Sequence, residues 1–192
     1  MMIKHYLTIG LILITIISCA NSKRADSLSS GQGSKSETEQ SQSKIICSSI
    51  KPHKFSSHET LDTFKIWIEG ESLLNSDVHF EIINSDKQKI YSVVFKSYLL
   101  LNYDISSDTI DFAKETFIKT RILKFFNEEN FISPAIKDGE TFYADYSDKT
   151  IWDEISADKN SVGFIYLIGE EDKRSIAYSK KQKKAVIYFN CC

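Results

Sequence analysis

Short segments in which apolar and polar residues alternate are the feature that most constrains the fold of this chain. Residues 63–69 alternate strictly, with three large apolar side chains on one side of an extended backbone. A period of two is typical of a strand with one buried face. A second alternating segment follows at 78–82, and a third strand, apolar on both faces, is expected at 90–95. Polar turn residues separate the three. We therefore expect three consecutive strands that pair as an antiparallel meander.

A long segment with helical periodicity follows the expected meander. Residues 108–130 carry apolar side chains over a broad helical face, and Asp108 is the expected N-cap. Arg121 interrupts the apolar face of this helix. The stretch at 131–147, which contains Pro134 and Gly139, is expected to be a loop. A second, shorter helix is expected over residues 148–157.

The C-terminal third predicts a second meander. Residues 162–168 are apolar on both faces, which is the mark of a central strand. Strands are also expected at 175–179 and 185–189, with turns at 170–173 and 180–183. The predicted order is βββ-α-α-βββ, an α+β fold in which two three-stranded antiparallel meanders flank a long helix and a short helix. This order argues against a parallel, nucleotide-binding sheet.

The N-terminal segment predicts where the protein is located. Lys4 precedes an apolar run at residues 7–17. A helix that spans a bilayer needs about 20 apolar residues, so this run is too short to span. A positive charge followed by a short apolar run instead fits the signal peptide of an exported protein.

The residues that end this run are Ile16, Ile17, Ser18 and Cys19. They resemble the lipobox of bacterial lipoproteins, with Ile at a first position that is usually Leu. The resemblance implies export, diacylglycerol on the Cys19 sulfur, cleavage after Ser18, and acylation of the new amine, with palmitate as the expected fatty acid. Ala20 stands where Asp retains enterobacterial lipoproteins in the inner membrane. This implies an envelope protein anchored in the outer membrane, on a face that the sequence leaves open.

The segment after the expected lipid anchor predicts a flexible tether. Residues 20–44 contain eight serines and three glutamines, and Leu28 is one of few apolar side chains among them. Such a composition buries too little surface to offset the entropy of ordering the chain. The expected organisation is a signal peptide at 1–18, a lipidated cysteine and tether at 19–44, and one folded domain at 45–192.

Three cysteines remain once Cys19 carries lipid: Cys47, Cys191 and Cys192. Export places them where disulfides persist. Neighbouring Cα atoms are about 3.8 Å apart, whereas bridged cysteines usually have Cα atoms about 4.4–6.8 Å apart. A bond between the two terminal cysteines would therefore be strained. We expect Cys47 to bridge to Cys191 or to Cys192, which would join the two ends of the domain.

Composition and motif spacing exclude several classes of function. The chain has 24 Lys+Arg against 26 Asp+Glu, so nucleic acid is not an expected partner. Cys47, His53, His58 and His79 lack the paired short spacings of a zinc site. The acidic stretch from 138 to 154 does not match a calcium-binding loop, and no Gly-x-Ser-x-Gly nucleophile motif occurs. We therefore assign no catalytic residue, no metal ligand and no cofactor.

Two side chains are candidate ligand contacts. Trp67 is expected on the polar face of its strand, and exposed aromatic residues are enriched at interfaces. Arg121 lies within the apolar helix face, where an arginine can hold an anionic group. The sequence therefore favours a lipid-anchored envelope protein whose domain binds an envelope protein or glycan without catalysis. The alternatives are a hydrolase of envelope polymers and an inhibitor of an enzyme that attacks the envelope.

Overall fold

The computed structural model describes residues 18–19, 44–106, 108–169 and 171–191. The expected signal segment up to residue 17, the tether segment 20–43 and Cys192 therefore lie outside the described residues. Among the helices that are described, none is both long enough and apolar enough to cross a membrane.

Five antiparallel strands form the larger sheet, in which neighbours in sequence are neighbours in space. They are β1 (Ser18–Cys19), β2 (Ile45–His53), β3 (Asp62–Glu69), β4 (Asp77–Ile83) and β5 (Lys89–Lys96). The three strands predicted at 63–69, 78–82 and 90–95 are β3, β4 and β5. The alternation in β3 is confirmed, because Phe64, Ile66 and Ile68 are fully buried on one face.

Four antiparallel strands form the smaller sheet, in the order β6-β7-β8-β9. They are β6 (Phe131–Ile132), β7 (Gly163–Ile168), β8 (Asp172–Ser179) and β9 (Lys184–Cys191). The turn predicted at 170–173 is too long, since Asp172 and Lys173 already pair in β8.

The helices differ in their bounds from the prediction. They are η1 (Ser97–Asp104), α1 (Asp111–Lys124), η2 (Glu128–Asn130) and α2 (Lys149–Ala157). The predicted N-cap Asp108 is wrong: the N-cap of α1 is Ile110, which makes no side-chain cap bond. The shorter helix is confirmed, because the Asp148 carboxylate accepts a hydrogen bond of 3.0 Å from the Ile151 backbone N–H.

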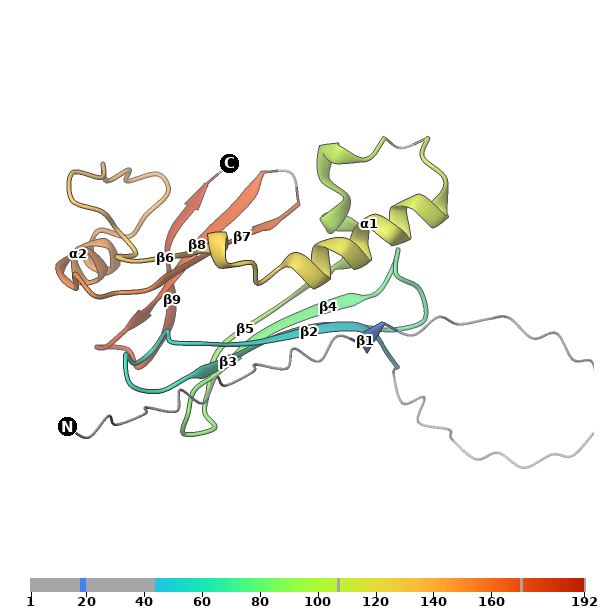
Figure 1. Ribbon diagram of the computed structural model, residues 1–192. Helices are drawn as coiled ribbons and strands as arrows, with labels where there is room; N and C mark the ends of the chain where they lie inside the picture. The colour runs from blue at the N-terminus through green and yellow to red at the C-terminus, as the bar shows by residue number, and fades with distance from the viewer. Residues whose placement is uncertain (1–17, 20–43, 107, 170, 192) are drawn as a thin grey trace, which may run out of the picture.

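Aromatic rings from α1 and both sheets form the main core. α1 lies across the larger sheet and beside β7 (Figure 1), and it buries Ile118 and Ile122. The Phe80 ring on β4 lies 5.4 Å from the ring of Phe125, 5.6 Å from Phe164 and 5.3 Å from Tyr166. The two sheets and the end of α1 are therefore held together by one aromatic cluster.

A second, smaller core lies under α2, at the other end of the molecule (Figure 1). Trp152 and Ile155 of α2 pack with Ala177 and Val186 of the smaller sheet and with Tyr188. The Tyr188 hydroxyl donates to the Ala135 carbonyl at 2.8 Å. The two helices therefore cover different sheets, α1 the larger sheet and α2 the smaller one.

The α+β class and the antiparallel sheets are as predicted, but the two three-stranded meanders are corrected to larger sheets. β2 escaped prediction because Cys47 is its only fully buried residue and its hydropathy does not alternate. β6 escaped because it has two residues, and Pro134, which lacks the backbone N–H of a ladder, follows close behind.

Candidate functional site

Trp67 lies on the outer face of the larger sheet and is engaged by its own neighbours. Its ring stacks on His79 of β4 with 4.8 Å between centroids, and the Lys65 ammonium lies 4.4 Å from the ring centroid. Its indole N–H donates to Glu69 at 3.1 Å. These contacts occupy both the ring and the polar atom of Trp67, so it is a weaker ligand contact than the sequence predicted.

Arg121 lies on α1, which covers the opposite face of the larger sheet, so the structure does not bring the two candidate contacts together. With its amide nitrogen turned toward carbonyls, Asn102 of η1 donates to Leu99 O at 2.8 Å and to Gly169 O at 2.7 Å. The amide oxygen then accepts from the Arg121 guanidinium, with 3.2 Å to Nη2. Arg121 thus helps to hold η1 and the β7–β8 turn against α1.

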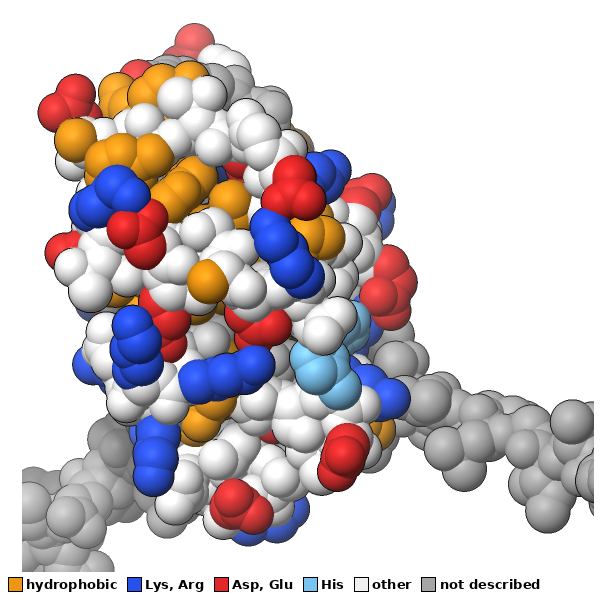
Figure 2. Space-filling model, turned by 90° about the vertical axis from the view of Figure 1, so that its left-hand side faces the viewer, with side chains coloured by type: hydrophobic (Ala, Val, Ile, Leu, Met, Phe, Trp, Pro, Cys, Tyr) orange, Lys and Arg blue, Asp and Glu red, His pale blue; other side chains and the backbone are white. Residues whose placement is uncertain are grey.

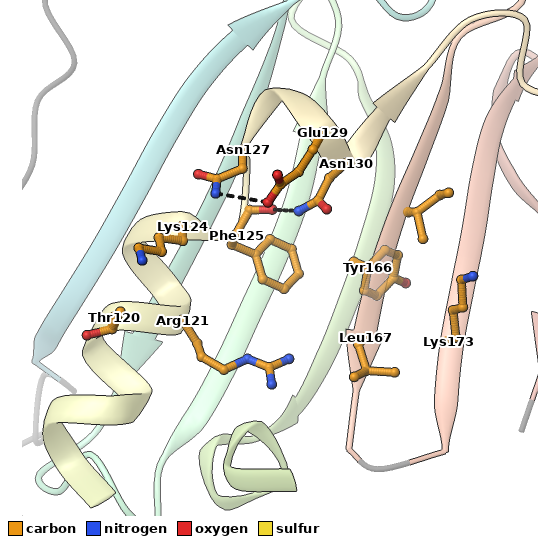
Figure 3. A pocket seen from close by; sticks show the side chains of 11 residues that line it. Thr120, Arg121, Lys124, Phe125, Asn127, Glu129, Asn130, Tyr166, Leu167 and Lys173 are labelled. Carbon is orange, nitrogen blue, oxygen red and sulfur yellow. Dashed lines mark hydrogen bonds between the residues drawn. The ribbon is translucent and has the colours of Figure 1, made fainter. Parts of the chain in front are cut away.

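The same arginine lines a depression on the described surface, which we call the α1–β7 groove. Its volume is about 430 Å³, within the range of pockets that hold small ligands. Figure 3 shows the Arg121 side chain extending from α1 toward β7, with Leu167 across from it on β7. The lining consists of Thr120, Arg121, Lys124, Phe125, Asn127, Glu129, Asn130, Ile165, Tyr166, Leu167 and Lys173.

Local hydrogen bonds fix the helical wall of the groove. α1 ends at Lys124, and the chain turns back through η2. The Asn130 side chain donates to the Phe125 carbonyl at 3.0 Å, and the Asn127 amide donates to Glu129 at 3.4 Å (Figure 3). These bonds satisfy polar groups at the helix end, where carbonyls lack partners within the helix. The wall is therefore set by the sequence of the turn itself.

The floor of the groove is apolar and its rim is cationic. Ile165 and Leu167 are half-buried on the face of β7 turned away from the main core, while Phe164 and Tyr166 are buried on the core side. Arg121, Lys124 and Lys173 contribute positive charge, and Glu129 is the one carboxylate in the lining. An apolar floor with a few polar groups is the usual composition of a ligand site.

Tyr166 supplies a neutral hydroxyl beside this floor. Burial, together with the neighbouring Tyr91 hydroxyl, raises the pKa of Tyr166 well above its usual value of 10.0. The Tyr166 and Tyr91 hydroxyls are hydrogen-bonded to each other. Arg174 lies close to both and makes a two-pronged contact with Asp172, Nε to Oδ1 at 2.8 Å and Nη2 to Oδ2 at 2.6 Å. This cluster, in which Tyr166 is buried and the other three side chains are half-buried, lies at the edge of the core next to the groove.

The residues considered for metal binding are scattered. Cys47 is buried in β2, His53 stacks on Phe131 at 3.8 Å between centroids, and His79 lies under Trp67. In the part of the chain that the structure describes, no three or more His, Cys, Asp or Glu side chains gather closely enough to hold a metal ion.

The acidic stretch at 138–154 is engaged with neighbouring groups. Asp138 and Asp153 form ion pairs with Lys159 and Lys149. Glu154 accepts a 2.8 Å bond from the Ser179 hydroxyl of the smaller sheet. Figure 2, which views the end of the molecule that carries α2, shows acidic and basic side chains interspersed over this face. Asp138 and Asp153 therefore form surface ion pairs, and Glu154 holds α2 against the end of β8.

Cys47 and Cys191 are both disulfide-bonded. Cys47 lies in β2 of the larger sheet, where the backbone register with β1 places Cys19 opposite it. Cys191 ends β9 of the smaller sheet, and Figure 1 does not place this end beside β2. The bridge from Cys47 to Cys191 or Cys192 stays a prediction, and the register adds Cys19 as a competing partner.

Arg121 was a candidate from the sequence, but the other lining residues Leu167, Lys173 and Glu129 were not. Leu167 and Lys173 face each other across the β7–β8 hairpin, far along the chain from Arg121, and Glu129 lies on a short helical turn. The signal that pointed to them was the apolar character of both faces of 162–168. It was interpreted as a central strand, whereas part of it is the floor of a groove.

Comparison of the chain with protein-family models, with curated proteins and with solved structures gives no match.

Proposed function

We propose that this chain is a lipid-anchored envelope protein whose folded domain binds a ligand in the α1–β7 groove and does not catalyse a reaction. The observation that carries the binding role is the groove itself. It combines a volume of about 430 Å³ with an apolar floor on β7 and a cationic rim.

The lining of the groove supports binding rather than hydrolysis. Hydrolysis of a glycan commonly uses two carboxyl groups that flank the bond. Glu129 is the one carboxylate among the lining residues, and it lies with two amides and three cations. Such a lining can hold a ligand through hydrogen bonds and charge, but it does not supply an acid and base pair.

The anchoring role is supported by the sequence around Cys19. The lipobox-like residues 16–19 and the Ser-rich segment after them would place the domain at a membrane surface, on a flexible spacer. Each buried methylene of an acyl chain contributes about 0.8 kcal/mol to membrane affinity, so several chains give stable anchoring.

Native mass spectrometry of the full chain, isolated from its own membranes in mild detergent, tests the binding role. We expect a bound species on the wild-type chain that is lost from a Leu167→Glu variant, because the new carboxylate fills the groove. Val94→Glu is the matched control, since Val94 is 53% exposed on β5, away from the groove. Equal amounts of the bound species on the wild-type, Leu167→Glu and Val94→Glu chains would contradict the proposal.

A further inference from the structure

Most of the β7 edge that borders the groove is not covered by another strand. β6 pairs with β7 at two positions, Phe131 with Phe164 and Ile132 with Gly163. In the described part of the chain, residues 165–168 of β7 pair with β8 on one side and with no strand on the other. The backbone N–H and C=O groups of an uncovered edge are a template for a further strand.

The groove runs along this uncovered edge. Ile165 and Leu167 of β7 form its floor, and the end of α1 with η2 forms its helical wall (Figure 3). Four residues of extended chain span about 13 Å at the usual rise of a strand. A short extended segment therefore matches the length of the edge that β6 leaves uncovered.

The local chain is prevented from covering this edge itself. β6 is antiparallel to β7, so an extension of β6 toward its N-terminus would lie opposite residues 165–168. The residues at that position form η2 instead, and the Asn130 side chain is bonded to the Phe125 carbonyl. The residues before β6 therefore do not form a strand beside residues 165–168 of β7, and a strand at this position would have to come from another segment.

The charge of the rim selects among extended segments. Lys124 and Lys173 are exposed, and Arg121 is half-buried in the same lining. Glu129 provides the opposing charge, so the rim keeps a positive excess. Charge complementarity favours an acidic occupant and raises its rate of association.

We infer that the α1–β7 groove binds an extended acidic peptide segment of another protein, which adds to residues 165–168 of β7 as an antiparallel strand. This inference rests on the proposed function and names the ligand class of the same site. In such strand addition, main-chain hydrogen bonds supply affinity and side-chain pockets supply specificity. Apolar side chains of the peptide would pack on Ile165 and Leu167, whose face Lys173 shares because it is the cross-strand partner of Leu167. The carboxylates of the peptide would point to the opposite face, toward Arg121 and Lys124 of α1.

Binding of a fluorescent, end-capped peptide of four Glu-Val repeats to the full chain in detergent tests this inference. Fluorescence anisotropy should show binding that weakens with added salt. A Lys-Val peptide of the same length should not bind. In a strand, alternate N–H groups point to the same edge. N-methylation of one alternate set of residues should therefore abolish binding, while N-methylation of the other set should leave it intact.

A pair of charge reversals on the same hairpin provides the protein side of the test. Lys173→Glu should weaken binding about tenfold, because it removes one cation and adds a repelling charge. Lys181→Glu makes the same change at the far end of the β8–β9 hairpin and should leave binding within about twofold. Hydrogen exchange at residues 165–168 should slow when the Glu-Val peptide is bound.

Several results would overturn the inference. These are no binding of the Glu-Val peptide, equal binding of the Lys-Val peptide, binding of both N-methylated peptides, or equal effects of the two charge reversals. Peptide binding that appears only after deletion of residues 20–43 would assign the groove to a segment of this chain itself. If the peptide fails while Leu167→Glu still loses its co-isolated species, strand addition is wrong and the proposed function stands.

Discussion

The hydroxyl groups of Tyr91 and Tyr166 are hydrogen-bonded to each other across the junction of the two sheets. Tyr91 belongs to β5 and Tyr166 to β7, and both side chains are largely removed from solvent. Burial raises the pKa of both phenols above the usual 10.0, and the rise is larger for Tyr166. The junction therefore requires both groups to stay neutral.

We expect this pair to make the folded state sensitive to alkaline pH. Above pH 10 an unfolded chain releases the phenolic proton, while the folded chain still holds it, so the free energy of unfolding falls as pH rises. Tyr166→Phe removes one such proton and should make the decline shallower, by up to about 1.4 kcal/mol per pH unit. Urea denaturation between pH 9 and about 11 measures the slope. Tyr143→Phe, an exposed tyrosine, is the control, and identical slopes for the two variants would contradict the assignment.

Phe80 is the residue on which the main core depends most. It is fully buried, and its ring contacts the rings of Tyr91 on β5, Phe125 at the end of α1 and Tyr166 on β7. We expect Phe80→Ala to lower the free energy of unfolding by about 3–5 kcal/mol, the usual cost of such a cavity. Phe112→Ala is the matched control, because Phe112 is 76% exposed and its loss should change stability by less than about 0.5 kcal/mol. Similar denaturation midpoints for the two variants would contradict the central role of Phe80. Phe80→Leu gives a milder test if the alanine variant does not fold.

The sequence predicted those elements whose pattern is local. β3 alternates because one face is buried, and α2 has an N-cap and an apolar face within nine residues. β2 could not be found in this way, because Lys51 and His53 point toward the core side, where Lys51 pairs with Glu128 at 2.6 Å and His53 stacks on Phe131. Their partners come from η2 and β6, far along the chain.

The sequence did not predict the groove either, because its lining residues also lie far apart along the chain. Arg121 was visible as a charge on an apolar face, but its neighbours Leu167 and Lys173 are set by how β7 pairs with β6 and β8. The edge of β7 is open because β6 is only two residues long. No local pattern at residues 162–168 predicts the length of β6. Long-range strand pairing thus decides the site, while local periodicity decides most of the elements around it.

Asp148 is expected to stabilise α2 through its cap. Its carboxylate accepts from the Ile151 N–H at 3.0 Å, and loss of such a cap costs about 1 kcal/mol. Asp148→Ala should therefore lower the melting temperature by about 2–4 °C for a chain of this size. Asp145→Ala removes a nearby exposed carboxylate outside the helix and serves as the control. Equal melting temperatures for the two variants would show that the cap contributes nothing measurable.

Cys19 is expected to be the sole attachment of the chain to the membrane. Cys19→Ser should release the protein into the soluble fraction after washing with high salt, since the acyl chains that stabilise anchoring are lost. The Cys192→Ser chain also loses one cysteine and should sediment with the membranes like the wild type. A Cys19→Ser chain that remains in the membrane pellet would contradict lipid anchoring at this residue.

The disulfide partner of Cys47 determines whether Cys19 is free to carry a lipid. Cys47 and Cys191 are disulfide-bonded, so we expect a thiol reagent to label neither residue in the unfolded, unreduced mature protein. Mass spectrometry of peptides from that protein then identifies the partners. A link from Cys47 to Cys191 or Cys192 would confirm that a bridge joins the two ends of the domain. A link from Cys47 to Cys19, which the β1–β2 register permits, would contradict lipidation, because one sulfur cannot carry both a lipid and a disulfide. The Cys47→Ser variant separates these two pairings further. If Cys47 is linked to Cys191 or Cys192, the substitution frees a thiol at the C-terminus. If Cys47 is linked to Cys19, the substitution frees the Cys19 thiol.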